Sequence, residues 1–369
     1  MATLPPPTQT CHSATGAARL FLTRSLLRTS RAAKRGNLSL IYRQAKHLLT
    51  LGYVGVILTS VHDSNSETKI YLGTSAFTAA GWQGTFYPPG IKSQDFLTFY
   101  AQHFDSVEVN STLYGCPTPR TVSNWAAKTP ENFIFAIKTP RSITHDKILL
   151  DCDDELDEFL TTMEILGPKL GPILFQFPQF SPGVFPDRHA FTDRLVPFLN
   201  KLPDARKYAI EIRNQEWLDA EFADLLRHHK IALVLQDLFY MPLPEELQKK
   251  FDPITAGWTY IRWLGDRKRI ETQTLTWDKT IVDRTSELTT WVDFCFQIKR
   301  RGITVYGYAN NHYAGHGPAT IRHFRDLWRK KGHPQLPEPA PPITTPDRAA
   351  TPTTKPAPIT PKKQPSLFD

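Results

Sequence analysis

The sequence predicts an α/β fold: a single TIM-barrel-like (β/α)8 domain between disordered N- and C-terminal extensions. Three observations support this prediction. Strand-like and helix-like segments alternate over about 260 residues, which is typical of a parallel sheet with crossover helices. Polar residues gather at the carboxyl ends of the predicted strands, where barrels form ligand sites. The glycine-rich phosphate motifs that many open sheets carry are missing.

The predicted strands are short runs rich in β-branched and aromatic residues, bounded by turn residues. They lie at residues 70–75, 106–110, 133–138, 172–177, 208–213, 231–237, 258–264 and 304–311. Apolar residues at helical spacing predict helices at residues 93–103, 118–128, 153–166, 187–200, 220–229, 284–300 and 318–330. Most of these helices fall between two strands, as a barrel requires.

The strand at residues 208–213 indicates most clearly where a site lies. Side chains alternate along a strand, so Ala209, Glu211 and Arg213 share one face. A buried parallel strand is usually apolar on both faces, and these two charges break that rule. We therefore place Glu211 and Arg213 at the carboxyl end of a barrel strand.

Other strands end in a similar way, and their polar residues predict a ligand site at the barrel mouth. The residues expected to bind substrate are Asn110, Tyr114, Lys138, Gln176, Arg213, Trp217, Asp237, Arg262, Asn310 and Asn311. Aromatic faces beside fixed cations suit a ligand with a flat or sugar ring and an anionic group such as phosphate. A small anionic ligand is therefore the expected partner.

The net charge of +8 does not predict a surface that binds nucleic acid. Residues 1–60 contain eight basic residues and no acidic one. Subtracting these eight from the 44 basic residues leaves 36, which balances the 36 acidic residues. The rest of the chain is neutral, so its composition does not indicate a polyanion partner.

The four cysteines are scattered without paired spacing, which argues against a disulfide framework and fits a reducing, cytoplasmic compartment. Apolar runs stay shorter than the roughly 18 residues needed to cross a bilayer, so no membrane partner is expected.

Residues 1–66 are predicted to be a basic extension outside the barrel domain, which spans residues 67–332. Three interpretations remain open. The extension can be upstream sequence from a misassigned start, an organellar transit peptide, or a secretory signal whose apolar core is residues 48–58. The misassigned start is the preferred interpretation. The secretory signal is least favoured, because the leader before that core is too long and no small-residue cleavage site follows.

Residues 333–369 are predicted to be a disordered tail, and the part from residue 334 holds eleven of the 31 prolines. The tail ends in Gln364-Pro365-Ser366-Leu367-Phe368-Asp369. A Leu-Phe pair at such a tip resembles the peptides with which bacterial DNA-maintenance proteins dock in the sliding clamp, although Pro365 replaces the usual Leu. Gln364, Leu367 and Phe368 are therefore candidate clamp-binding residues, and an inert tail end is the alternative.

Several motifs together resemble domain-of-unknown-function family 72, also called the YecE-like proteins. The matching runs are Gly73-Thr74-Ser75, residues 82–88, residues 107–114, Lys138 with residues 143–145, Leu170-Gly171-Pro172 through Gln176, residues 211–213 with Trp217, and Asn310-Asn311-His312. The resemblance implies a TIM-barrel-like fold and no established activity. The chain departs from many relatives at residues 75–77 and at Gly115, where an Arg is common.

Glu108 and Glu211 are the leading catalytic candidates, as a pair of carboxylates with different environments. The alternative is a salt-bridge lattice that closes the top of the barrel without chemistry. Lys138 suits a phosphate anchor or, less favoured, a Schiff-base nucleophile, because neighbouring carboxylates should hold its pKa up.

His145 and His312 are further catalytic candidates. They could also bind a metal together with Glu108, Glu211 or Asp237, but isolated histidines more often serve as hydrogen-bonding residues. Neither H-x-H nor H-E-x-x-H occurs, so a metal is not favoured, and no motif for a nucleotide cofactor is present.

Two functions are carried forward. The first is an enzyme, of hydrolase or lyase/isomerase type, that uses acid-base chemistry on a phosphorylated or sugar-containing substrate. The second is a DNA-maintenance factor recruited to the sliding clamp, either nuclease-like or a non-catalytic binder. The neutral core weighs against the second, because duplex binding depends on neutralising phosphates.

Overall fold

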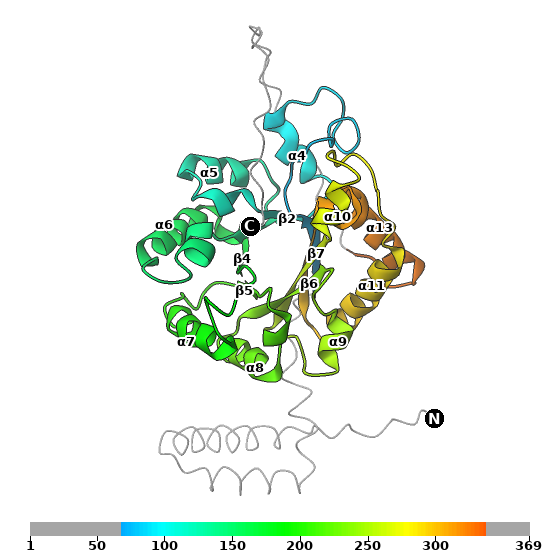
Figure 1. The fold of residues 1–369 in the computed structure, drawn as a ribbon. Coiled ribbons are helices and arrows are strands. Elements are labelled where there is room, and N and C mark those ends of the chain that lie inside the picture. The colour runs from blue at the N-terminus through cyan, green and yellow to red at the C-terminus, as the bar shows by residue number, and fades with distance from the viewer. Residues whose placement is uncertain (1–67, 337–369) are drawn as a thin grey trace, which may run out of the picture. The chain divides into compact units, whose positions relative to one another are not determined.

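The structure is a computed structural model that describes residues 68–336. These residues form a barrel of eight parallel strands surrounded by helices (Figure 1), which confirms the predicted fold class. The predictions for residues 1–66 and for the clamp-binding residues Gln364, Leu367 and Phe368 lie outside the described residues.

All eight predicted strands are present, with ends displaced by at most two residues. They are β1 (Ile70–Thr74), β2 (Ser106–Val109), β3 (Ile134–Lys138), β4 (Leu170–Gln176), β5 (Tyr208–Glu211), β6 (Ala232–Leu238), β7 (Trp258–Gly265) and β8 (Thr304–Ala309). The hydrogen-bonded order is β1-β8-β7-β6-β5-β4-β3-β2. Sequential strands are therefore neighbours, as the barrel topology demands.

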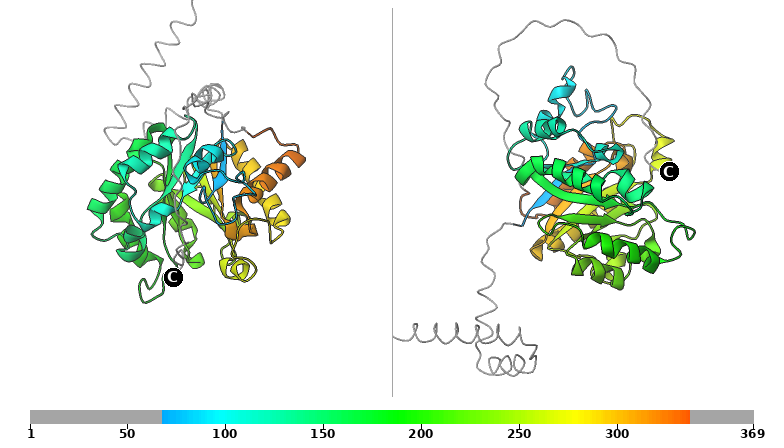
Figure 2. Two further views of the ribbon diagram at one scale, coloured as in Figure 1. Left: turned by 90° about the horizontal axis from the view of Figure 1, so that it is seen from above. Right: turned by 90° about the vertical axis from the view of Figure 1, so that its left-hand side faces the viewer.

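Helices cover the outside of the strands (Figure 2). They are α4 (Phe96–Tyr100), α5 (Pro119–Ala127), α6 (Asp153–Met163), α7 (Arg188–Leu199), α8 (Ala220–His228), α9 (Pro244–Gln248), α10 (Arg267–Glu271), α11 (Thr285–Arg300), α12 (Asn311–Ala314) and α13 (Gly317–Lys330). The helix predicted at residues 93–103 is instead a 3-10 turn (Ser93–Asp95) followed by the short α4. The sequence did not predict α9, α10 and α12, because one or two turns are too short to show a period.

Capping side chains fix where several helices begin. Thr118 accepts a hydrogen bond from the Thr121 backbone N–H at 3.2 Å, ahead of Pro119 in the first turn of α5. Asp187 and Asp219 cap α7 and α8 in the same way, at 2.9 and 2.8 Å. Such caps satisfy backbone donors that have no partner within the helix.

Among the described residues, no helix combines the length and apolar character that a membrane crossing requires.

Two apolar layers hold the barrel together. The outer layer lies between strands and helices, while the barrel interior is filled by a separate cluster. Within this interior cluster, β7 and β8 contribute Trp258, Tyr260, Tyr306 and Tyr308, and β3, β5 and β6 contribute small residues such as Ala209. Large side chains from one side thus fill the space left by small ones on the other. The inward positions above this layer form the barrel mouth.

Strands β1 and β2 are the two ends of the sheet order, and side chains join them where the barrel closes. We call this junction the β1–β2 seam. The Asp105 carboxylate accepts the Leu72 backbone N–H at 2.8 Å. The Tyr100 hydroxyl accepts the Thr74 N–H at 2.8 Å and donates to the Ser106 carbonyl at 3.2 Å. These side chains supply bonds that a strand ladder supplies elsewhere in the barrel.

Gly73 lies at the closest approach of the seam, and we expect Gly73→Ala to destabilise the protein. A Cβ atom at this position would sit 1.9 Å from the Ser106 carbonyl oxygen, which is backbone and cannot rotate away. The strands would have to separate, at a cost of about 2 kcal/mol in the free energy of unfolding. Urea unfolding monitored by circular dichroism measures the loss.

Gly257→Ala is the matched control, because nothing lies within 4 Å of its added Cβ. We expect that control to stay within about 0.5 kcal/mol of the wild type. Equal stabilities for the two variants would show that the seam can widen without cost.

The described chain continues beyond the predicted domain end at residue 332. His333 stacks on Phe296 of α11 with ring centroids 3.8 Å apart, and the Trp328 indole N–H donates to the Pro334 carbonyl at 2.7 Å. Leu336 is buried. Aromatic surfaces on α11 and α13 thus give the Pro-containing residues 333–336 a place to pack.

Candidate active site

Inward-facing polar side chains form a ring at the barrel mouth. Strand alternation places Glu108, Lys138, Gln176, Glu211, Gln236 and Arg262 on the inner face. The strand register sets several of them side by side, because Gln176 pairs with Glu211 and Gln236 pairs with Arg262. The ring therefore draws one polar residue from each of six consecutive strands, β2 to β7.

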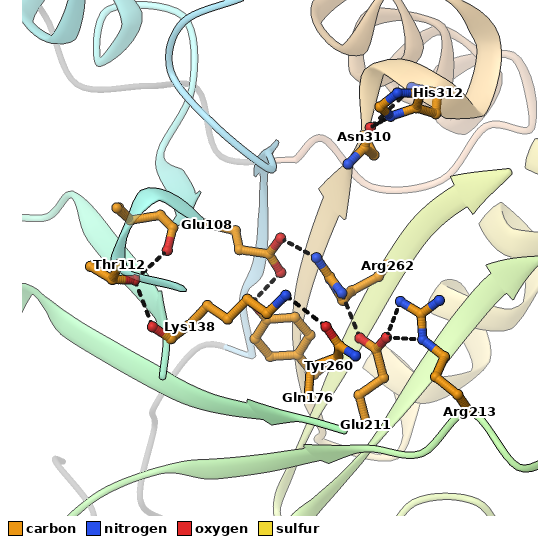
Figure 3. Close-up of polar contacts among 11 residues, drawn as sticks. Glu108, Thr112, Lys138, Gln176, Glu211, Arg213, Tyr260, Arg262, Asn310 and His312 are labelled. Carbon is orange, nitrogen blue, oxygen red and sulfur yellow. Dashed lines mark hydrogen bonds and ion pairs between the residues drawn. The ribbon is translucent and has the colours of Figure 1, made fainter. Parts of the chain in front are cut away.

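Arg262 lies between Glu108 and Glu211 and binds both glutamates (Figure 3). Its Nη2 donates to Glu108 Oε1 at 2.8 Å, and its Nη1 donates to Glu211 Oε2 at 2.6 Å. The second oxygen of Glu108 accepts the Tyr260 hydroxyl at 2.7 Å. Burial alone would lower the pKa of Arg262, but the two carboxylates raise it instead. Arg262 is therefore a permanent cation shared by two carboxylates.

Glu211 is fully buried and also binds Arg213, whose Nε donates to its Oε1 at 2.6 Å. Burial alone would raise the pKa of Glu211, but Arg213 and Arg262 outweigh burial and lower the pKa to about 2. Glu211 thus stays ionised at every pH at which the protein is expected to work. This part of the site resembles the salt-bridge lattice considered as the alternative to catalysis.

Lys138 is only 3% exposed, and its Nζ donates to the neutral amide oxygen of Gln176 at 2.6 Å. Burial and the Arg262 charge lower its pKa to about 7, against the opposite effect of the Glu211 and Glu108 carboxylates. The expectation that nearby carboxylates hold this pKa up is therefore wrong. The carboxylates are close, but guanidinium groups already occupy them.

Replacing Lys138 by Met should change how stability depends on pH. The amine has a pKa of about 7 in the folded protein against the usual 10.5, so the unfolded state binds more protons between these values. Wild-type stability therefore rises with pH across this window, and methionine removes that rise. Between about pH 6 and about pH 9.5, the wild type should gain roughly 2–3 kcal/mol relative to Lys138→Met.

Urea unfolding of both proteins at the two pH values measures this difference. The half-exposed Lys147, paired with Glu155, provides the control variant Lys147→Met, for which we expect no such change. A constant difference between wild type and Lys138→Met would mean that the Lys138 amine titrates normally.

His145 lies in a single π-helical turn (Ser142–Asp146) after β3. Its Nδ1 is 2.8 Å from the Thr144 hydroxyl. Burial and the positive charge of Lys138 lower its pKa to about 4, so the imidazole is neutral at pH 7. It can exchange hydrogen bonds with a ligand but does not carry charge there.

The loop after β8 holds its polar residues in structural contacts. His312 bonds with Nδ1 to Asn310 Oδ1 at 2.6 Å and with Nε2 to Glu271 Oε1 at 3.0 Å. Asn310 also caps α12. The Asn311 side-chain oxygen accepts from the Trp82 indole at 3.2 Å and from the Gly317 N–H at 2.9 Å. Figure 3 shows Asn310 and His312 apart from the glutamate pair.

Three further residues that the sequence predicted to bind substrate lie outside the ring. Asp237 accepts hydrogen bonds from the Trp291 indole and the Tyr313 hydroxyl, both at 2.8 Å, so it faces the helix layer and not the mouth. Trp217 is buried and stacks on Phe180 and Phe191. Tyr114 is 53% exposed at the end of the turn after β2. None of these three contacts the Arg262 network in the described residues.

Sequence reasoning missed Gln236 and chose its neighbour Asp237. Gln236 donates with Nε2 to the Ile212 carbonyl at 2.7 Å, while its Oε1 is buried without a partner among the described residues. Asn110 Oδ1 and Ser75 Oγ are buried in the same unpaired state. Buried polar atoms without partners are costly, so these three mark positions where a ligand or water is expected to bind. Gln236 shares a strand face with Ala232 and Val234, but both faces of β6 are buried, so the sequence pattern did not decide between Gln236 and Asp237.

In the part of the chain that the structure describes, no group of three or more His, Cys, Asp or Glu side chains is arranged to hold a metal ion. The cations of the ring are Arg262 and Lys138, its anions are Glu108 and Glu211, and Arg213 adds a third cation that pairs with Glu211. The four paired charges cancel, so a protonated Lys138 leaves one positive charge for an anionic ligand.

A family model described as "Protein of unknown function DUF72" matches residues 71–344. UPF0759 protein YecE of Escherichia coli K12 is 36% identical over 149 residues, which are 40% of this chain and 50% of that protein. UPF0759 protein YunF of Bacillus subtilis is 29% identical over 159 residues, 42% of this chain and 54% of that protein. The chain therefore spans about half the length of the curated relatives it matches.

Two solved structures of DUF72 family proteins are also similar. One from Thermotoga maritima superimposes with a TM-score of 0.56 and 28% identity, over 71% of this chain and 98% of that one. One from Enterococcus faecalis gives a TM-score of 0.52 at 20% identity, again over 71% and 98%, which supports the barrel fold.

Proposed function

This chain belongs to the DUF72 family of proteins of unknown function, and we propose that it is an enzyme using acid-base chemistry on a small anionic, hydroxylated molecule. The reaction takes place at the carboxyl-terminal mouth of the barrel. The observation that supports this most is the Lys138 amine, which is buried, bonded to a neutral amide and has a pKa of about 7. An acid or base works best when its pKa lies near the working pH.

In this proposal Lys138 moves the proton, and the two glutamates hold the site in place. Arg213 and Arg262 fix Glu211, whose pKa of about 2 makes it a weak base. Glu108 is likewise held by Arg262 and Tyr260. Their charges set the potential around Lys138 and keep the guanidinium groups fixed, so little reorganisation is needed when a charged substrate binds.

The expected substrate class follows from the same contacts. Once Lys138 is protonated, its charge is buried and has no ionic partner within 4.0 Å in the described residues, so an anionic group on the ligand would compensate it. The buried oxygens of Asn110 and Gln236 are acceptors that lack a donor. Hydroxyl groups supply such donors. A phosphorylated sugar or a sugar acid carries both features.

Solvent exchange in D2O tests this function even while the product is unidentified. The full chain is incubated with a panel of sugar phosphates and sugar acids, and proton NMR follows the loss of C–H signals beside carbonyl or carboxyl groups. We expect the wild type to exchange at least one compound. Lys138→Met should exchange it about a hundred times more slowly or worse, because a positioned acid-base group contributes at least this factor.

Lys147→Met, which alters a lysine outside the ring, should keep the wild-type exchange rate. The same panel is tested for an increase in melting temperature, which reports binding separately from chemistry. A panel that neither exchanges nor raises the melting temperature would contradict the proposal.

A second candidate function rests on the sequence Gln364-Pro365-Ser366-Leu367-Phe368 near the end of the chain. We propose it as a docking peptide for a bacterial sliding clamp, which would place the protein in the cytoplasm as a DNA-maintenance factor. A pull-down with purified clamp compares the full chain with one that ends at Lys363. Capture of only the full chain supports the docking peptide, whereas equal capture of both, or of neither, contradicts it.

A further inference from the structure

Lys138 is the only buried lysine among the described residues, and its amine lacks an ionic partner there. Its Nζ bonds to one neutral oxygen, Gln176 Oε1, and no carboxylate of the described residues lies within 4.0 Å. By contrast, Lys147, Lys201 and Lys331 form ion pairs with acidic side chains on the surface. The buried position therefore does not serve to pair an ammonium group with a carboxylate.

The arrangement of the neighbouring charges keeps this amine available. Glu108 uses its two oxygens for Arg262 and Tyr260, and Glu211 uses its two for Arg262 and Arg213. Guanidinium groups bind carboxylates through two donors at once, so an ammonium group does not displace them easily. The charged and titratable groups around Lys138 are thus Glu108, Glu211, Arg213, Arg262 and His145.

An amine in such surroundings has a use beyond proton transfer. Burial, the Arg262 charge and the Arg213 charge lower the pKa to about 7 against the effect of Glu211 and Glu108, so the unprotonated amine is populated at neutral pH far more than for an ordinary lysine. The unprotonated amine carries the lone pair that attacks a carbonyl carbon. A lysine that only anchored phosphate would instead be expected to stay protonated.

We propose that Lys138 forms an imine with the carbonyl carbon of the substrate, a hydroxylated aldehyde or ketone that carries a negative charge. This inference rests on the proposed function, because it assigns a covalent role to the same amine in the same site. The contacts that carry it are the bond from Nζ to the neutral Gln176 oxygen and the occupation of both glutamates by other donors.

The step needs no oxidant or reductant. The Nζ lone pair forms a bond to the carbonyl carbon, and the C=O π pair moves to oxygen. A proton passes from nitrogen to that oxygen, which gives a carbinolamine. The hydroxyl group takes up one proton from solvent and leaves as water while the nitrogen lone pair forms the C=N bond, which leaves a protonated imine. Amine, carbonyl compound and one solvent proton together thus become a protonated imine and water.

The charge of the site suits this product. Glu108 and Glu211 balance Arg213 and Arg262, and the protonated imine adds one positive charge. The negative group of the substrate compensates that charge inside the barrel, where an unpaired ion is costly. The unpartnered oxygens of Asn110 and Gln236 accept its hydroxyl groups. Asn110 and Lys138 each follow one residue after the paired Val109 and Ile137, so they are neighbours at the mouth.

Borohydride trapping tests the imine. The full chain is incubated with glyceraldehyde 3-phosphate, with hydroxypyruvate, or with uncharged glyceraldehyde, then reduced with sodium borohydride and digested for mass spectrometry. The phosphate and carboxylate probes distinguish which anionic group the site prefers. We expect a reduced adduct on Lys138 with at least one charged probe, at about ten times the extent found on other lysines or more.

Lys169 is the internal control. It is partly buried, and burial also lowers its pKa, but it donates to the Ala126 and Thr129 carbonyls outside the mouth. Lys138→Met and Lys138→Arg should both lose the adduct, and the arginine variant keeps a cation at this position in case the methionine variant folds poorly. Equal adducts on Lys138 and Lys169, or none on Lys138 with any probe, would overturn the proposal.

The experiments distinguish the imine at Lys138 from the acid-base function. If panel compounds raise the melting temperature and undergo solvent exchange but no adduct forms on Lys138, the imine is wrong and the acid-base function stands. If neither binding, exchange nor adduct occurs, both are wrong. An adduct on Lys138 that the charged probes form and glyceraldehyde forms about tenfold less supports both.

Discussion

Replacing Arg262 by Met is expected to lower the free energy of unfolding by about 4 kcal/mol at neutral pH. The substitution keeps the apolar stem but removes the only group that binds both Glu108 and Glu211 in the described structure. Both glutamates are fully buried, and Glu108 would keep only the Tyr260 hydroxyl. For a domain of this size, the melting temperature should fall by about 10 °C.

Lowering the pH should restore part of the stability that Arg262→Met loses. Such a recovery would show that the loss comes from buried carboxylates left without a cation. Without the Arg262 guanidinium, two buried carboxylates share only the Arg213 cation, so uptake of a proton as the pH falls relieves the uncompensated charge and the variant gains stability relative to wild type. The wild-type Glu211, with a pKa of about 2, shows no such gain in the same range. Melting temperatures of both proteins between about pH 5 and about pH 8 measure this difference.

A variant that removes one buried charge of each sign provides the control. Arg262→Met combined with Glu108→Gln leaves the Glu211–Arg213 ion pair in place and no uncompensated carboxylate, and should recover much of the stability at neutral pH. A loss below about 1 kcal/mol for Arg262→Met alone would show that water reaches the two glutamates.

The second large effect is expected at Asp237. Asp237→Leu should cost about 3 kcal/mol, because it leaves the Trp291 indole and the Tyr313 hydroxyl buried without an acceptor. Asp237→Asn keeps one oxygen in place and should stay within about 1 kcal/mol of the wild type. Burial raises the pKa of Asp237, so loss of its charge is tolerated better than loss of its oxygen. Urea unfolding compares the two variants.

This pair also separates a structural role from ligand binding. Asp237→Asn should leave unchanged the ligand-induced rise in melting temperature, because the side chain faces α11 and not the mouth. If Asp237→Asn kept normal stability but lost the ligand-induced rise in melting temperature, Asp237 would take part in ligand binding, as the sequence predicted.

Strand alternation carried most of the sequence prediction that succeeded. Eight short runs were enough to place the barrel, because the outer and inner faces of parallel strands are both buried and a charge inside such a run stands out. Glu108, Lys138, Glu211 and Arg262 were found in this way, and all four lie in the same ring. The residue types and their faces therefore sufficed to bring these four side chains together in one ring.

The choice between Gln236 and Asp237 exceeded what the pattern contains. Both are polar, they are adjacent, and they sit near the end of a strand that is buried along its whole length. Only the register with β7, where Gln236 lies opposite Arg262, decides which one faces the mouth. That register depends on contacts between distant parts of the chain, which a single sequence does not display.

Pairing among charged groups was also beyond the sequence. Glu108, Glu211, Lys138, Arg213 and Arg262 were all expected at the mouth, and several pairings were compatible with that set of residues. In the structure, the guanidinium groups of Arg213 and Arg262 bind the two glutamates. The Lys138 amine therefore bonds to a neutral amide oxygen. The chemistry proposed for Lys138 follows from that outcome and not from the composition of the site.

The β1–β2 seam gives the barrel a preferred place to open. Elsewhere, neighbouring strands share a ladder of backbone bonds, but at the seam Leu72 and Thr74 donate their N–H groups to the side chains of Asp105 and Tyr100. Rotation of two side chains releases these amides, whereas ladder amides wait for strands to part. In native-state hydrogen exchange, the Leu72 and Thr74 amides should therefore exchange faster than the amides of β7. The lowest-energy local opening of the folded protein would then be the separation of β1 from β2.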